Sequence, residues 1–177
     1  MVQPKNIVLF VDASGSTSLE TLLGSIALLE QLIQENSVLF AYGDSRVAHL
    51  EKIPYKSGKT QAEQISDNRK RKLKSLSALS RFRTAHGMTK LPECLDELQT
   101  KIPADWKDNH SLLVISDLDI SEADLARLPS AATYIVVNQY APKKILPSNI
   151  SNSIRCTPAD FKRQLLTTIN EAVATLN

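Results

Sequence analysis

The chain has 177 residues, of which 42% are hydrophobic and 23% are charged, and its formal net charge is +2. These values are typical of a globular protein with a sizeable core, and they exclude a disordered chain. No repeat, low-complexity tract or linker marks an internal boundary, so we expect residues 1–177 to form a single domain.

The absence of a recognisable targeting signal and the spacing of the cysteines both indicate a cytoplasmic protein. The first residues lack the apolar core of a signal peptide, and no apolar run has the length of a membrane span, so no membrane partner is expected. Cys94 and Cys156 lie far apart and in no metal-binding spacing. We therefore expect two reduced thiols in the core.

Residues 6–18 pass from a buried strand to the start of a helix. The unbroken apolar run at 7–11 predicts a strand buried on both faces, as in a parallel sheet. Asp12, Ser14 and Ser16 follow this run directly, and a helical apolar pattern begins soon after them. These side chains are therefore expected at the carboxyl end of a central strand, where open α/β sheets bind ligands.

The three polar side chains at this strand end make a plausible ligand set for a metal ion. Alternate positions in an extended turn can aim three side-chain oxygens at one point. One carboxylate and two hydroxyls suit Mg²⁺, Mn²⁺ or Ca²⁺ rather than zinc. Aspartate and serine are also common in ordinary turns and caps, so this motif alone is equally consistent with a structural turn.

The next elements predict a helix followed by a hairpin. Apolar residues recur at helical spacing over residues 19–35, and the apolar run at 38–42 predicts another strand. Residues 46–53 are expected to return antiparallel, because the turn at 43–45 is too short to hold a crossover helix.

Residues 54–83 form a basic insert with two interpretations. Its basic side chains are Arg69, Lys70, Arg71, Lys72, Lys74, Arg81 and Arg83. One interpretation is an electrostatic patch for nucleic acid or an acidic partner. The other, which we favour, is the solvated face of a helix whose leucines point inward, because no base-reading module accompanies the charges. The candidates for partner contact are Arg69, Arg71, Lys72 and Arg83, together with the nearby His86.

Two further polar side chains lie at predicted element boundaries. Thr89 comes immediately before a stretch in which leucines recur at helical spacing, and the proline at position 92 is compatible with a first helical turn. Asp117 follows the buried-type strand at 112–115. Asp119, two residues later, is interpreted as an exposed turn or cap residue.

Strands at 134–137 and 153–156 and a final helix complete the pattern. The order β-α-β-β-α-α-β-α-β-β-α predicts an α/β fold with three layers. It comprises a mainly parallel central sheet with one antiparallel edge strand, and helices on both faces.

The polar positions resemble the metal-ion-dependent adhesion site (MIDAS) of von Willebrand factor A (VWA) domains. That family carries Asp-x-Ser-x-Ser after its first strand, a threonine before a later helix, and an aspartate after a later strand. The resemblance covers nearly the full chain and implies a Rossmann-like VWA fold. The metal ligands that it implies are Asp12, Ser14, Ser16, Thr89 and Asp117. Met88 departs from the pattern, since the family commonly has glycine before the threonine.

The resemblance also implies a function. It implies a non-catalytic interaction module in which a divalent cation takes an aspartate or glutamate of a partner protein as a ligand. Mg²⁺ is the first expectation, with Mn²⁺ or Ca²⁺ as alternatives. Intracellular members of the family often work beside AAA+ ATPases of the MoxR type, so such an ATPase is a candidate partner.

Two alternatives belong to other functional classes. A haloacid-dehalogenase-like phosphatase would use Asp12 as its nucleophile, but it needs a second acid two residues later, where this chain has Ser14. Nucleic-acid binding through the basic residues at 69–83 is the other alternative. We rank both below the interaction module.

Overall fold

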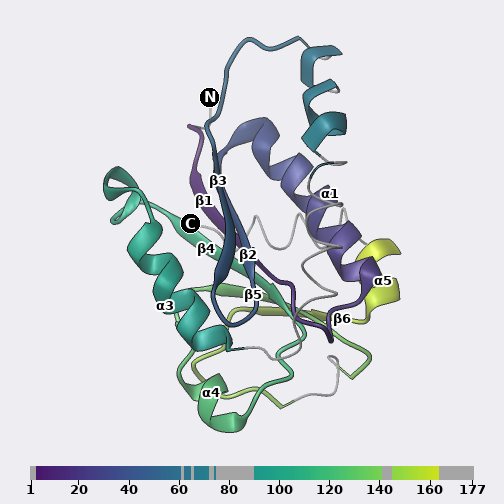
Figure 1. Cartoon of the computed structure of the whole chain (residues 1–177), viewed down its shortest axis with the longest axis vertical. Helices are drawn as coiled ribbons and strands as arrows, with labels where there is room; N and C mark the ends of the chain where they lie inside the picture. The colour runs from purple at the N-terminus through teal and green to yellow at the C-terminus, as the bar shows by residue number, and fades with distance from the viewer. Residues whose placement is uncertain are drawn as a thin grey trace.

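The computed structural model of the protein describes residues 3–60, 62–64, 66–71, 74, 90–140 and 145–163. Within these residues six strands form one sheet in the order β3-β2-β1-β4-β5-β6 (Figure 1). The strands are β1 (Asn6–Asp12), β2 (Ser37–Gly43), β3 (Val47–Ile53), β4 (Ser111–Ser116), β5 (Thr133–Val137) and β6 (Ser153–Cys156). The helices are α1 (Leu19–Glu35), α3 (Leu91–Lys101), α4 (Glu122–Ala126) and α5 (Pro158–Arg163), with a short 3₁₀ helix η1 (Ala104–Trp106) after α3.

The sheet has the predicted mixture of parallel and antiparallel strands. Neighbouring strands run parallel except for β2 and β3, which form the antiparallel hairpin at one edge. From β1 the chain moves outward to β2 and β3, and it then returns to the other side of β1 as β4. The carboxyl ends of β1 and β4 therefore adjoin where the strand order reverses, which is the common ligand-binding position in such sheets.

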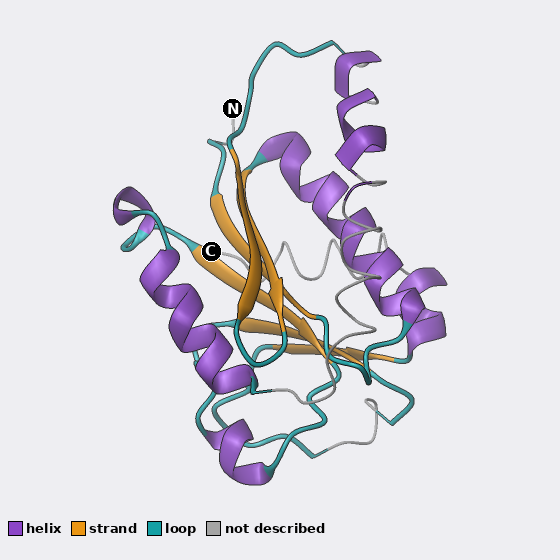
Figure 2. Cartoon of the chain, viewed as in Figure 1, coloured by secondary structure: helices purple, strands orange, loops and turns teal. Residues whose placement is uncertain are grey.

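Helices cover both faces of the sheet, as predicted. Figure 2 shows α1 and α5 on one side of the strands and α3 and α4 on the other. Alternate residues of β1 serve two separate cores: Leu9 and Val11 pack on the α1 side, while Val8 and Phe10 pack on the α3 side. This double burial explains why β1 is an unbroken apolar run rather than an alternating one. Among the described helices, none combines the length and apolar character needed to cross a membrane.

A close approach between α1 and α5 depends on a glycine. A Cβ atom built on Gly24 would lie 2.3 Å from Cε1 of Phe161, so any larger residue would displace that ring. Phe161 is fully buried against α1. At the start of α1 the Ser18 hydroxyl accepts a hydrogen bond from the Thr21 N–H at 3.2 Å, which caps the helix. Together these two contacts fix the position of α1 and hence of the loop that precedes it.

The basic insert is described only in part. Residues 62–64, 66–71 and 74 have helical backbone, whereas Lys72 and Arg83 lie outside the described residues. The linker from β3 carries this helical stretch to the far end of the molecule, beyond the C-terminal end of α1 (Figure 1).

Candidate metal site

The loop after β1 is folded around Asp12. The Ser14 N–H donates a hydrogen bond to Oδ1 of Asp12 at 3.0 Å. The Thr17 hydroxyl donates to the Asp12 carbonyl oxygen at 2.9 Å, and the Ala13 N–H donates to the Gly43 carbonyl at 2.9 Å. These bonds hold the carboxylate of Asp12 in place before the helix begins, and its exposed fraction is 1%.

The end of β4 supplies the second half of the site. The parallel register pairs Val11 with Ile115, and this places Ser116 beside Asp12. The Ser116 hydroxyl donates to Oδ2 of Asp12 at 2.7 Å and accepts from the Leu118 N–H at 3.0 Å. Leu118 has a φ of 49°, in the left-handed region that non-glycine residues seldom occupy, so the chain turns sharply after Asp117.

The two halves meet through serine hydroxyls. The Ser16 hydroxyl donates to Oδ2 of Asp117 at 2.5 Å, and its oxygen lies 3.2 Å from the Ser14 hydroxyl oxygen. A continuous series of hydrogen bonds thus runs from Asp12 through both serines to Asp117. The structure therefore brings together four of the five side chains that the sequence singled out, from two loops about a hundred residues apart.

The fifth side chain, Thr89, lies outside the described residues, as does His86. Helix α3 begins at Leu91, with Lys90 at its N-cap position. The Lys90 N–H donates to the Asp44 carbonyl oxygen at 3.0 Å, just beyond the carboxyl end of β2. The start of α3 is therefore anchored at the same edge of the sheet as Asp12, one strand away.

Burial makes the Asp12 carboxylate energetically costly. Loss of solvent raises the pKa of Asp12 from 3.8 to about 6, and the negative charge of Asp117 adds to the increase, while the hydrogen bond from Ser116 opposes it. A bound cation would favour the charged form of this carboxylate and reverse the shift.

The donor set fits a hard divalent cation. Two carboxylates formally balance the charge of such an ion, and hydroxyl oxygens are compatible with Mg²⁺, Mn²⁺ or Ca²⁺. Within the described ranges, histidine, cysteine, aspartate and glutamate do not gather in groups of three or more that could hold a metal. Any ion at this cluster would therefore depend on the serines as well as the acids. Ser16 and Gly15 are exposed, so the cluster faces solvent on one side.

Sequence reasoning did not assign roles to three neighbouring residues. Ser116 bonds directly to Asp12, Thr17 lies 3.4 Å from the Ser14 hydroxyl, and Asn138 donates from the end of β5 to the Asp117 carbonyl oxygen at 2.6 Å. A hydroxyl residue at the last position of β4 was the available signal for Ser116. Asp119 is exposed, as predicted for a turn residue, and its N–H donates to Oδ1 of Asp117 at 3.1 Å.

Cys94 and Cys156 are buried, as expected. Cys94 lies beneath this edge of the sheet, where burial, aided by the charges of Glu97, Asp12 and Asp44, raises its pKa to about 12. Cys94 is therefore a neutral thiol at neutral pH.

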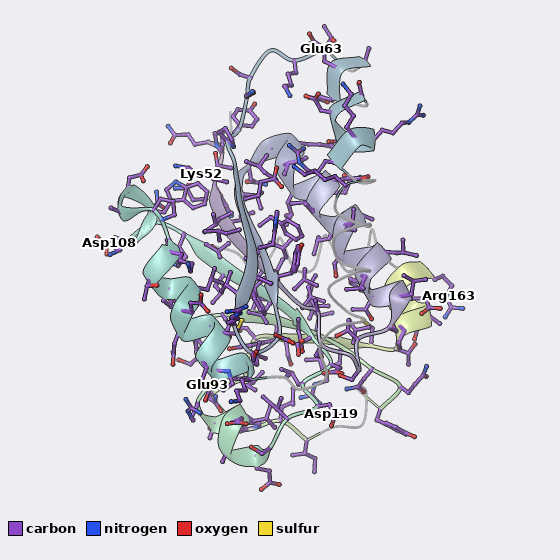
Figure 3. The ribbon with its side chains drawn as sticks, viewed as in Figure 1. Lys52, Glu63, Glu93, Asp108, Asp119 and Arg163 are labelled. Atoms are coloured by element: carbon purple, nitrogen blue, oxygen red, sulfur yellow. The ribbon has the colours of Figure 1, made fainter. Side chains whose placement is uncertain are left out.

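Two of the basic side chains predicted to contact a partner, Arg69 and Arg71, lie away from this cluster. Arg69 is exposed, and Arg71 lies with its Nε 3.7 Å from Oε1 of Glu51 on β3. Figure 3 shows Asp119, next to the cluster, and Glu63, in the helical part of the insert, at opposite ends of the molecule. Arg69 and Arg71 therefore do not border the candidate metal site. Lys72, Arg83 and His86 lie outside the described residues.

Solved structures share this fold at low sequence identity, whereas no protein-family model and no curated protein matches the chain. BatB from Bacteroides thetaiotaomicron aligns with a TM-score of 0.59 at 10% identity, over 97% of this chain and 98% of that one. An aerotolerance-related membrane protein from Bacteroides fragilis aligns with a TM-score of 0.51 at 13% identity, over 97% and 94% of the two chains. The pilus adhesin SpaC from Lactobacillus rhamnosus GG aligns with a TM-score of 0.54 at 12% identity, over 97% of this chain and 31% of SpaC. The six-stranded, mainly parallel sheet with one antiparallel edge strand has a VWA-like fold.

Proposed function

We propose that this VWA-like chain is a protein-interaction module whose binding depends on a divalent cation held by Asp12, Ser14, Ser16 and Asp117. The observation that supports this most strongly is the 2.5 Å contact between the Ser16 hydroxyl and Oδ2 of Asp117, which joins the loops after β1 and β4. A second support is the buried carboxylate of Asp12, whose raised pKa a cation would lower again.

Each residue has a distinct part in the proposal. Asp12 and Asp117 supply the negative charge, while Ser14 and Ser16 supply neutral oxygens. Ser116 orients the Asp12 carboxylate through its 2.7 Å hydrogen bond and is a positioning residue rather than a ligand. Thr89 is proposed as a further ligand from the segment before α3.

The exposed side of the cluster is where a partner would bind. Mg²⁺ prefers six oxygen ligands and commonly keeps several waters, so a partner carboxylate can replace one of them. When bound, the ion supplies the positive charge that attracts this carboxylate. We propose that the partner presents an aspartate or glutamate there, and that a MoxR-type AAA+ ATPase is one such partner.

Calorimetry and thermal unfolding test the metal part of this proposal. We expect Mg²⁺ or Mn²⁺ to bind the wild-type protein and to raise its melting temperature, and Asp12→Asn to remove both effects while the protein stays folded. Asp119→Asn is the matched control, because this acid is exposed and two residues from Asp117. A folded wild-type protein that gives neither heat nor a shift in melting temperature would overturn the metal site.

A capture experiment tests the interaction part. Immobilised wild-type chain and Asp12→Asn are compared for retention of candidate ATPase partners in Mg²⁺ and in chelator. Retention by the wild type in Mg²⁺ alone supports the proposal, and equal retention in all four conditions contradicts it. Hydrolysis of an aryl phosphate that Asp12→Asn abolishes would replace it with the phosphatase alternative.

A further inference from the structure

A pocket with a volume of about 480 Å³ lies beside the C-terminal end of α1. Ile33 and Gln34 of α1 form one side of it, and β3 and the helical part of the insert form the others. Tyr42 and His49 meet in its wall as a stacked pair, with ring centroids 4.8 Å apart and planes at 12°. The candidate metal site lies at the other end of α1, which as a 17-residue helix is about 25 Å long. Asp12, Ser14, Ser16 and Asp117 do not line the pocket.

Positive charge dominates the lining of this pocket. Its described basic residues are Lys52, Lys56, Lys59, Lys70, Arg71 and Lys74, while its described acids are Glu51 and Asp67. The excess is confined to one concave surface, where the potentials of neighbouring charges add and attract anions.

The two acids are already engaged. Lys59 pairs with Asp67, and Glu51 lies 3.7 Å from both Arg71 and His49. Lys52 extends to the opposite face of the sheet, where its ammonium lies 5.3 Å from the centre of the Trp106 ring.

Three lysines therefore remain to act on a ligand. Lys56, Lys70 and Lys74 form no ion pair with any acid in the described part of the chain. Lys56 belongs to the linker after β3, and Lys70 and Lys74 belong to the helical part of the insert.

Arg71 adds an unsatisfied donor to the same pocket. Its Nε is shielded from solvent and, among the described side chains, it is the buried polar atom without a hydrogen-bond partner. Buried polar atoms in folded proteins nearly always have such a partner. The separation from Glu51 is 3.7 Å, too long for a hydrogen bond, so an acceptor from a ligand would complete the environment of this guanidinium.

We propose that this pocket binds a compact anion carrying two or more phosphate groups, held by Lys56, Lys70, Lys74 and Arg71. A volume near 480 Å³ is in the range of small-molecule sites and encloses a ligand on several sides. Nucleic acid would instead require an extended basic surface that follows its backbone. Phosphate suits these residues because it accepts several charge-assisted hydrogen bonds at once.

Calorimetric titration with sodium tripolyphosphate tests this proposal. The titration is run in chelator, so that the result does not depend on the candidate metal site. We expect saturable binding with one site per chain, and Lys70→Gln/Lys74→Gln is expected to weaken it by about tenfold or more. The control is Lys101→Gln/Lys107→Gln, which removes the same charge from the surface near α3 and is expected to leave the affinity within about twofold.

Three results would overturn the proposal. They are the absence of binding by the folded wild type, equal losses of affinity in the two double variants, and binding of duplex DNA that tripolyphosphate does not displace. The third would favour a nucleic-acid surface instead. Thermal unfolding of each variant shows whether it is folded, and Lys56→Gln, in the linker, provides an independent single variant that alters no helix.

Discussion

The two ends of α1 carry charges of opposite sign in opposite surroundings. At its N-terminal end, Asp12 and Asp117 are buried, with exposed fractions of 1% and 6%, and both carboxylates accept hydrogen bonds. At its C-terminal end, Lys56 and Lys70 are exposed around an open pocket. The acids are fixed by the fold, whereas the lysines are mostly solvated.

This difference decides how strongly each end is coupled to folding. A buried carboxylate loses its hydration, so its charge state changes the stability of the whole protein. Solvated lysines lose little on folding, and their mutual repulsion is weakened by salt. The acidic end should therefore affect stability and metal binding together, while the basic end should affect anion binding with little effect on stability.

The largest expected effect is a pH-dependent contribution of Asp12 to stability in metal-free protein. Its pKa is about 6 in the folded state and near 3.8 in the unfolded state. Between these values the folded state holds the proton that the unfolded state has released, so stability falls as pH rises. The expected loss is about 3 kcal/mol, complete above pH 6, because each pKa unit corresponds to about 1.4 kcal/mol.

Urea unfolding in chelator, from about pH 3.5 to pH 7, measures this contribution as the difference in the free energy of unfolding between the wild type and Asp12→Asn. The variant lacks the titrating group, so its stability relative to wild type should increase across this interval. If the free energy of unfolding varied with pH in the same way for the two proteins, burial would not raise the pKa of Asp12.

A smaller effect is expected at Ser116. Ser116→Ala removes the hydroxyl that donates to Oδ2 of Asp12, which raises the pKa of Asp12 further and leaves its carboxylate less well oriented. We expect the affinity for Mg²⁺ to fall by about tenfold at pH 7. Ser121→Ala is the control, since that hydroxyl caps α4 and its loss should lower stability without changing the affinity. Equal Mg²⁺ affinities in wild type and Ser116→Ala would remove Ser116 from the site.

The smallest effect concerns the basic end without its ligand. Lys70→Gln/Lys74→Gln should raise the free energy of unfolding by a few tenths of a kcal/mol at low ionic strength, because it reduces repulsion among neighbouring lysines. The gain should disappear in about 1 M salt, where the screening length is only about 3 Å. Destabilisation by more than 1 kcal/mol would show that these lysines stabilise the fold. It would contradict the expected difference between the two ends of α1 in their coupling to folding.

Much of the acidic end followed from local sequence patterns. The apolar run before Asp12 and the one before Asp117 each predicted a buried strand, and parallel strands place their carboxyl ends at one edge. That was sufficient to predict that the two acids would lie close together. The hydrogen bond between Ser116 and Asp12 could not be predicted in this way, because it depends on the register between β1 and β4.

The basic end was harder to predict. Its pocket is formed by the end of α1, by β3 and by the insert, and no short sequence motif predicts that these segments come together. The run of basic residues at 69–74 gives little hydrophobic periodicity, so the sequence suggested either a solvated helix face or a patch for a partner. Only the three-dimensional arrangement shows that Lys70 and Arg71 face the same concavity as His49.

Crystals of the wild-type protein grown with Mn²⁺ test the central claim most directly, through the anomalous scattering of the ion. We predict a single strong peak in contact with the side-chain oxygens of Asp12, Ser14 and Ser16, with Asp117 bound directly or through water. A peak elsewhere, or none at a saturating concentration of Mn²⁺, would contradict a metal-dependent site at this edge of the sheet.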